Sequence, residues 1–367
     1  MKRCVRCLYP ETKPDLHFDA DGVCSACIAF DARQGVDWGM REIDFCKLLD
    51  VNKGGTHDVI VACSGGKDST AQIVKVLQLG YRPLAVTATT DDLSPLGRRN
   101  LDNVAKLCDH VEVTAHVPTR RKISKFALQE VGDISWCEHH LIWSIPVREA
   151  VQRKIPIVLY GECPQNEYGA GPAGSADMSK MTKDWIHEFG GLLGMRLSDV
   201  ADQLNLDQRN LDVFNYPAEL GYTQAIFMGY YFAWDGFQNA ILAEKNGFST
   251  YERDHVEGSL FNYENLDNHQ TGIHDYLRFL KFGYGRCIDI ACSHIRRGRM
   301  TREEAWQLVS KRDGAFPWTY LGQPIEDTLG KIGVGLDEFM EICDRFANKA
   351  ILVKTGGENG TWKLQSD

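Results

Sequence analysis

Short apolar runs alternate with amphipathic segments in the first half of the chain. The apolar runs predict buried strands at residues 58–63, 82–89, 110–114 and 155–160. The segments between these runs place apolar residues on one face and predict helices at residues 68–79, 98–108, 122–131 and 139–154. Strands that alternate with helices pair in parallel, so the sequence predicts an α/β fold with a doubly wound parallel sheet.

The pattern differs on both sides of this region. Residues 1–30 hold paired cysteines and turn formers with little periodic pattern, which predicts a small separate module. Residues 31–57 predict a connector with a helix near residues 40–49. A loop rich in Gly, Pro and Ala spans residues 161–179, and a loop of this length is often functional.

Beyond this loop, strand signals fade and the pattern favours helices. These are predicted at residues 230–245, 271–283, 301–311 and 337–348. The predicted organisation is a cysteine module (1–30), a connector (31–57), an α/β domain (58–225) and a mainly helical C-terminal region (226–367).

The charge and the hydropathy of the chain narrow the functional classes. The 367 residues carry a formal net charge of −9, which argues against a large nucleic-acid-binding surface. The sequence contains no apolar run near the ~20 residues that span a bilayer, and no apolar segment of an export signal follows Met1. We therefore expect a cytoplasmic protein without a membrane span, whose twelve cysteines are thiols or metal ligands.

A glycine-rich loop lies between the first predicted strand and its helix. It consists of Ser64, Gly65, Gly66, Lys67, Asp68 and Ser69. Glycines let the backbone approach phosphate oxygens, and the unpaired amides of the following helix favour an anion. Lys67 adds a positive charge, and Asp68 is the nearest candidate ligand for Mg²⁺, with Asp91 and Asp92 as weaker candidates.

The spacing of this loop differs from that of the Walker A loop. It resembles the Ser-Gly-Gly-x-Asp-Ser signature of the PP-loop ATP pyrophosphatases, with every fixed position present. The resemblance implies a PP-loop fold, cleavage of ATP between the α and β phosphates, and an adenylylated intermediate. All six residues are then expected to bind ATP, with Lys67 and Asp68 acting in catalysis.

Two cysteine pairs stand near the N-terminus. Cys4 and Cys7 are separated by 16 residues from Cys24 and Cys27, a spacing typical of a four-thiolate zinc site. The module is too short to bury its own core, so a metal would supply its stability. Zn²⁺ in a structural role is the prediction, and two disulfides or an iron–sulfur cluster are the alternatives.

Several features together give a more specific resemblance. They are the cysteine module, the Ser64–Ser69 loop, Gly161-Glu162 after the fourth strand and the segment Phe282-Gly283-Tyr284-Gly285-Arg286. Over nearly the whole chain the sequence is similar to the N-acetyl sugar amidotransferase family. Members of that family build acetamidino sugars for bacterial surface polysaccharides, such as the O-antigen of lipopolysaccharide, and for flagellar glycans.

The resemblance implies a reaction and partners. The carbonyl oxygen of the N-acetyl group on a nucleotide-linked sugar would attack ATP, and ammonia would then displace AMP to leave an acetamidine. The sequence contains no glutaminase signature. One class of glutaminases uses a cysteine directly after the initiator methionine, and here Lys2 occupies that position. A separate glutaminase and an ammonia-channel subunit are therefore the expected partners.

Further candidates flank the loop. Glu162 follows a strand and is expected to position ammonia, orient the imidate or bind Mg²⁺; capping the next segment is the alternative role. Arg286, Arg296, Arg297 and Arg299 form a basic cluster that suits a diphosphate or a carboxylate, or alternatively a solvated helical face.

Two other functions compete with this interpretation. A PP-loop tRNA sulfur-transfer enzyme would need a sulfur-carrying cysteine near ATP, such as Cys137 or Cys163, and a basic surface. A zinc-module protein that binds nucleotide without catalysis is the second hypothesis.

Overall fold

The computed structural model describes residues 1–169, 178–357 and 360–365. Its centre is a six-stranded sheet with the order β3-β2-β1-β4-β6-β5. The strands are β1 (Val59–Ala62), β2 (Pro83–Ala88), β3 (Asp109–Val113), β4 (Ile157–Tyr160), β5 (Lys180–Met181) and β6 (Gln224–Phe227). All neighbours pair in parallel except β5, which runs antiparallel to β6. The predicted doubly wound α/β fold is confirmed.

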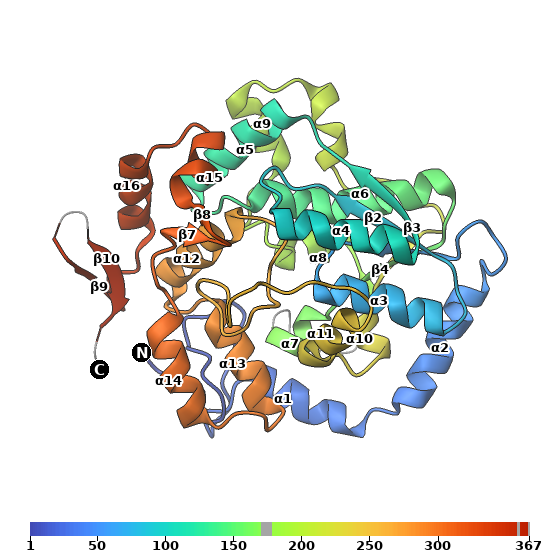
Figure 1. Cartoon of the computed structure of the whole chain (residues 1–367), viewed down its shortest axis with the longest axis horizontal. Helices are drawn as coiled ribbons and strands as arrows, with labels where there is room; N and C mark the ends of the chain where they lie inside the picture. The colour runs from blue at the N-terminus through green and yellow to red at the C-terminus, as the bar shows by residue number, and fades with distance from the viewer. Residues whose placement is uncertain (170–177, 358–359, 366–367) are drawn as a thin grey trace.

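Helices cover both faces of this sheet (Figure 1). One face carries α2 (Trp38–Asp50), α3 (Lys67–Gln78), α4 (Pro95–Leu107) and α10 (Met228–Tyr231). The other carries α5 (Val117–Glu130), α6 (Trp136–Arg153), α8 (Lys183–Phe189) and α9 (Leu197–Leu204). Successive β1 residues point to opposite faces, so Val59 and Val61 join one core and Ile60 the other.

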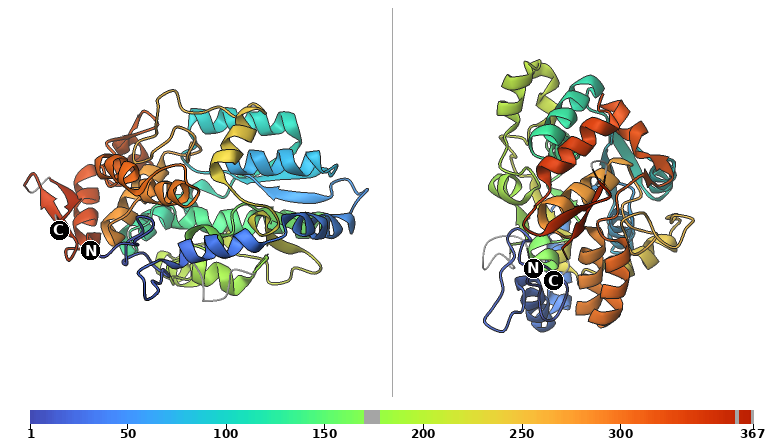
Figure 2. Two further views of the ribbon diagram at one scale, coloured as in Figure 1. Left: turned by 90° about the horizontal axis from the view of Figure 1, so that it is seen from below. Right: turned by 90° about the vertical axis from the view of Figure 1, so that its left-hand side faces the viewer.

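The C-terminal region is mainly helical, as predicted. Its helices are α11 (Gly236–Glu244), α12 (Gln270–Phe282), α13 (Arg286–Arg296), α14 (Arg302–Arg312), α15 (Ile325–Lys331) and α16 (Leu336–Phe346). Two hairpins accompany them, β7 (Thr319–Tyr320) with β8 (Gln323–Pro324), and β9 (Leu352–Thr355) with β10 (Thr361–Leu364). The N-terminus lies near the β9–β10 hairpin in all views (Figures 1 and 2).

The N-terminal residues share their core with this region. Leu8, Tyr9 and the four cysteines pack against α13 and α14 (Figure 1). Helix α1 (Ser25–Ala32) begins at the second cysteine pair and contacts α7 (Pro164–Tyr168). The predicted domain boundaries stay a prediction, and residues 170–177 of the predicted functional loop lie outside the described residues.

Two expectations about local structure were wrong. The predicted helix at residues 230–245 is two helices, α10 and α11, because Phe232 is extended and Asp235 caps a new helix by accepting from the Phe237 amide at 3.1 Å. Strands do not stop at the loop of residues 161–179, since β5 and β6 lie beyond it and complete the sheet. Their short runs of two and four residues give little periodic signal.

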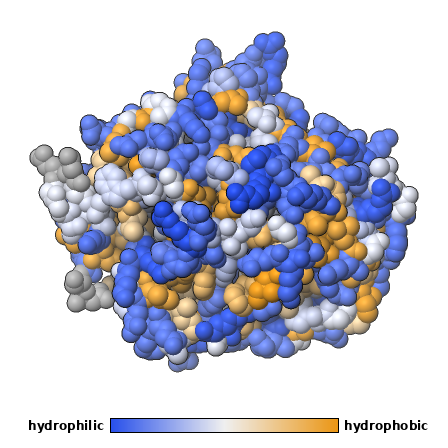
Figure 3. Space-filling model, viewed as in Figure 1, coloured by the Kyte–Doolittle hydropathy of each residue, from blue (hydrophilic) through white to orange (hydrophobic). Residues whose placement is uncertain are grey.

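Among the described residues no helix is both long enough and apolar enough to cross a bilayer. On the face in Figure 3, hydrophilic residues predominate and apolar residues lie in small groups between them.

Candidate active site

The Ser64–Ser69 loop joins the carboxyl end of β1 to the first turn of α3. Gly65 has φ +78°, and a Cβ there would lie 2.9 Å from Leu101 Cδ2, so only glycine fits. Gly66 precedes α3 and offers no side chain to cap it. The first amides of α3 are therefore available to an anion, as the motif predicted.

Lys67 lies buried at the start of α3 between two carboxylates. Its Nζ lies 2.7 Å from Asp68 Oδ2 and 3.0 Å from Glu264 Oε2. Burial opposes the charged form, but these carboxylates outweigh it and hold the pKa of Lys67 well above its ordinary value. Lys67 is thus a permanent cation beside the loop.

Asp68 and Glu162 lie next to each other at this edge of the sheet. Asp68 Oδ1 accepts a hydrogen bond of 2.8 Å from the Asn239 amide on α11. Glu162 follows β4, and burial together with the Asp68 charge raises its pKa above the ordinary value. Glu162 can therefore hold or accept a proton more readily than a solvated carboxylate.

Two cavities meet at these residues. A cleft of about 390 Å³ lies over the carboxyl ends of β1, β2 and β4 and is lined by Ser64, Ser69, Thr89 and Glu138, among others. A polar cavity of about 70 Å³ lies beside it and is lined by Lys67, Glu167, Trp234 and Glu264, among others. Asp68, Glu162 and Arg286 line both, so the two cavities adjoin at these side chains.

The predicted arginine cluster separates into different environments. Arg286 begins α13 and is held by Asp275 at 3.1 Å. Arg296 is buried and donates to the Glu167 carbonyl at 2.7 Å, while its Nη1 has no partner within the described residues. Arg297 pairs with the Glu167 carboxylate at 2.9 Å, and Arg299 pairs with Asp235. Arg286 and Arg296 line the small polar cavity, and Arg299 does not.

The other predicted Mg²⁺ candidates are engaged elsewhere. Asp91 forms an ion pair with Arg121 at 2.8 Å. Asp92 is buried and accepts from Thr328 and Lys331. Among these three aspartates, Asp68 is the one that lines the cleft.

Several site residues were missed by sequence reasoning. Glu264 and Asn239 reach Lys67 and Asp68 from distant loops and helices, with no motif to mark them. Glu138 lies on α6, 3.6 Å from the buried Arg120, and its Oε1 has no hydrogen-bond partner within the described residues. Burial raises the pKa of Glu138 to about 7 against the opposing charge of Arg120.

The predicted cysteine site is assembled in the structure. The Sγ atoms of Cys4, Cys7, Cys24 and Cys27 lie within 4.8 Å of one another, and all four side chains are buried thiols. The amides of Cys7 and Cys24 approach Cys4 Sγ at 3.5 and 3.3 Å. Zinc–thiolate bonds of about 2.3 Å in a tetrahedron fit such a cluster, so these residues can hold Zn²⁺.

Comparisons with known proteins bear on the C-terminal region. Residues 227–365 match the family model described as LPS biosynthesis protein WbpG-like, C-terminal domain. Among curated proteins there is no match. A solved structure of NMN synthetase from Francisella tularensis aligns with a TM-score of 0.29 and 12% identity over 58% of this chain and 89% of that chain. The family match confirms the predicted resemblance for the C-terminal part of the chain.

Proposed function

We propose that this chain, whose residues 227–365 match the WbpG-like lipopolysaccharide biosynthesis family model, is an ATP-dependent N-acetyl sugar amidotransferase. The amide carbonyl oxygen attacks the α phosphate of ATP and pyrophosphate leaves. Ammonia then adds to the carbon of the O-adenylyl imidate, and the C–O bond breaks to release AMP. The original oxygen departs on AMP, and an acetamidine remains on the sugar.

The observation that carries the proposal is the arrangement around the Ser64–Ser69 loop. The uncapped start of α3 supplies amides to the pyrophosphate, and Ser64 adds a hydroxyl donor from the cleft wall. The Ser69 hydroxyl donates to the Gly66 carbonyl at 3.1 Å and would exchange this contact for a phosphate oxygen. Lys67 adds positive charge where pyrophosphate leaves. For this role Lys67 exchanges its contact with Glu264 for a phosphate oxygen.

Metal ions have distinct places in this proposal. Asp68 would hold Mg²⁺, which neutralises phosphate charge when bound. Its Oδ1 is already oriented by Asn239. The four cysteines would hold Zn²⁺ as a structural ion, since four thiolates leave no open position.

The small polar cavity suits the second half of the reaction. Its volume of about 70 Å³ admits ammonia but excludes a nucleotide, and Glu162 connects it to the cleft. Ammonia arrives largely protonated at neutral pH unless a channel delivers it. Glu162, with its raised pKa, accepts the proton that the attacking nitrogen loses.

The competing sulfur-transfer hypothesis lacks a suitable cysteine. Cys137 and Cys163 are both buried. Burial raises the pKa of Cys163 to about 11 and that of Cys137 well above its ordinary value. Thiols of this kind are poor sulfur carriers because the thiolate is the reactive form.

The test is a pair of assays with the purified chain and UDP-linked diacetamido sugars. Ammonium with ATP and Mg²⁺ should yield AMP and a product of slightly lower mass, because NH replaces oxygen. Glutamine should not replace ammonium, since the glutaminase and the ammonia channel are separate subunits in this proposal. Glutamine-dependent turnover by the chain alone would overturn that division, and absence of AMP in every arm would overturn the function.

A further inference from the structure

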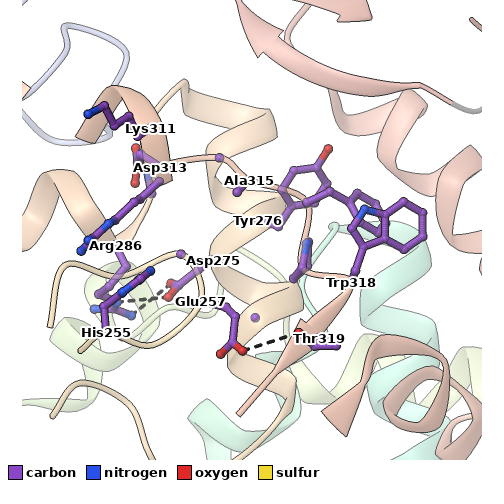
Figure 4. A pocket seen from close by; sticks show the side chains of 17 residues that line it. His255, Glu257, Asp275, Tyr276, Arg286, Lys311, Asp313, Ala315, Trp318 and Thr319 are labelled. Carbon is purple, nitrogen blue, oxygen red and sulfur yellow. Dashed lines mark hydrogen bonds and ion pairs between the residues drawn. The ribbon is translucent and has the colours of Figure 1, made fainter. Parts of the chain in front are cut away.

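A separate cavity of about 330 Å³ adjoins the site through Arg286 (Figure 4). It lies between the start of α13, the end of α14 and the segments around residues 255–258 and 314–319. Arg286 lines this cavity, the cleft and the small polar cavity. The cavity therefore lies next to the predicted ATP site, with the Arg286 side chain between them.

The carboxylates of this cavity are occupied by contacts within its wall. Asp313 accepts from the amides of Gly285 at 2.7 Å and Cys287 at 3.0 Å, which caps α13. Asp275 holds Arg286, and Glu257 accepts from the Leu321 amide at 3.0 Å. Arg286 offsets the charge of Asp275, and Arg253 at 3.5 Å offsets that of Glu257. Burial raises the pKa of Asp313 to about 6, which reduces its charge near neutral pH.

Two cations of the cavity are less constrained. Lys311 is exposed and forms no ion pair within the described part of the chain. Arg312 donates from Nη1 to the Leu260 carbonyl at 3.2 Å, and its Nη2 lies 3.7 Å from a carboxylate oxygen of the exposed Asp254. Neighbouring Lys and Arg side chains of this kind suit a diphosphate.

Aromatic side chains lie across the cavity from Lys311, with Trp318 and Tyr276 on the far side in Figure 4. Trp318 is 54% exposed, which is unusual for so large a side chain. Its ring centroid lies 4.4 Å from that of Phe316, which in turn packs on Tyr276 at 5.1 Å. A rigid, half-exposed indole at a cavity rim is a stacking surface for a planar ring.

We propose that this cavity binds the nucleoside diphosphate of the sugar substrate. The base stacks on Trp318, the diphosphate contacts Lys311 and Arg312, and the acetamido group extends past Arg286 to the ATP cleft. The assignment rests on the proposed function, which requires a sugar donor beside ATP. The volume of about 330 Å³ lies at the lower end of ligand pockets and holds part of such a substrate.

Calorimetric titration of the full chain with UDP tests the assignment without any turnover. UDP should bind, and saturation with a non-hydrolysable ATP analogue should leave its affinity unchanged. Trp318→Ala and the double variant Lys311→Ala/Arg312→Ala should each weaken UDP binding by about tenfold or more. Uridine lacks the diphosphate and should bind the wild-type chain more weakly than UDP does. Uridine and UDP should bind the Lys311→Ala/Arg312→Ala variant with equal affinity.

Matched controls exist on the same molecule. Trp306, 39% exposed, lies outside this cavity, and Lys349 is exposed near the C-terminus. Trp306→Ala and Lys349→Ala should bind UDP as the wild type does. All variants should bind the ATP analogue normally, which shows that they are folded.

Several outcomes would overturn the site. They are displacement of UDP by the ATP analogue, equal affinity in the Trp318 variant, or uridine binding as tightly as UDP. Failure of the proposed function gives a different result. In that case UDP binds at Trp318 but no AMP forms with ammonium and acetamido sugars. Conversely, the Trp318 and lysine–arginine variants could form AMP with an unchanged KM for the UDP-sugar. That result would support the proposed function but reject this cavity as the nucleotide site.

Discussion

Removal of the Lys67 ammonium is the most direct perturbation of the site. The side chains of Lys67 and Glu264 are only 9% and 14% exposed. Truncating one partner of a buried pair costs about 3–5 kcal/mol, because the other charge stays buried. Asp68 keeps the Asn239 amide, so we expect Lys67→Ala to cost about 3 kcal/mol of the folding free energy.

The catalytic loss from the same change is separate. A contact to charge that develops in the transition state is worth about 3–4 kcal/mol, or at least about a hundredfold in rate. Lys67→Met/Glu264→Gln removes the cation and one carboxylate together. This variant should recover much of the lost stability, and its rate should stay as low as that of Lys67→Ala.

The assay is AMP formation with ammonium at about pH 9, beside urea unfolding of each variant. The pH does not disturb Lys67. Its pKa is raised, so the stability from its charge is fully present below the ordinary value of 10.5 and is lost only as pH rises through the folded value. Recovery of rate together with stability in the double variant would refute the catalytic role and leave a structural one.

Three further predictions follow from the other groups. Purified protein should contain about one equivalent of zinc, and the double variant Cys4→Ser/Cys24→Ser should lose this metal. Hydrogen exchange in α13 should then become faster in the variant, and iron or intact disulfides in the wild type would contradict the assignment. Glu162→Gln should lower ammonium-dependent product formation by about 10²–10⁴-fold while a first turnover of pyrophosphate persists; equal loss of both would mean that Glu162 acts before ammonia does. The raised pKa of Glu138 means that its protonated form stabilises the fold below the ordinary value of 4.5, and this stability is lost as pH rises through about 7. Glu138→Gln should therefore lose less stability than the wild type between about pH 5 and 8, and parallel pH profiles would contradict the raised pKa.

The parts of the site that could be predicted lie close together in the sequence. The Ser64–Ser69 loop needs only a strand before it and a helix after it, so its position follows from local pattern. The four paired cysteines likewise lie within a segment of 24 residues, from Cys4 to Cys27, so their spacing can be read from the local sequence. In both cases the physical requirement is met by neighbours along the chain.

The parts that could not be predicted depend on packing between distant segments. Glu264 is 197 positions from Lys67, and Asn239 is 171 positions from Asp68. Their local sequence carries no periodicity that points to the loop. The break between α10 and α11 did have a signal, since Asp235-Gly236 is a typical start of a helix, but the helix-forming residues around it obscured the cap.

Helix α13 offers a reason for the cysteine module in this chain. Cys292 accepts from the Leu8 amide at 3.3 Å, and Asp289 accepts from the Tyr9 hydroxyl at 3.0 Å, so the module contacts one side of the helix. Arg286 and Asp289 on the same helix line the small polar cavity. A segment of 30 residues has no core of its own, and a metal bound to its four thiolates would make it rigid enough to fix α13. Because Arg286 lines all three cavities, a small shift of this helix would disturb the proposed ATP, ammonia and sugar sites together.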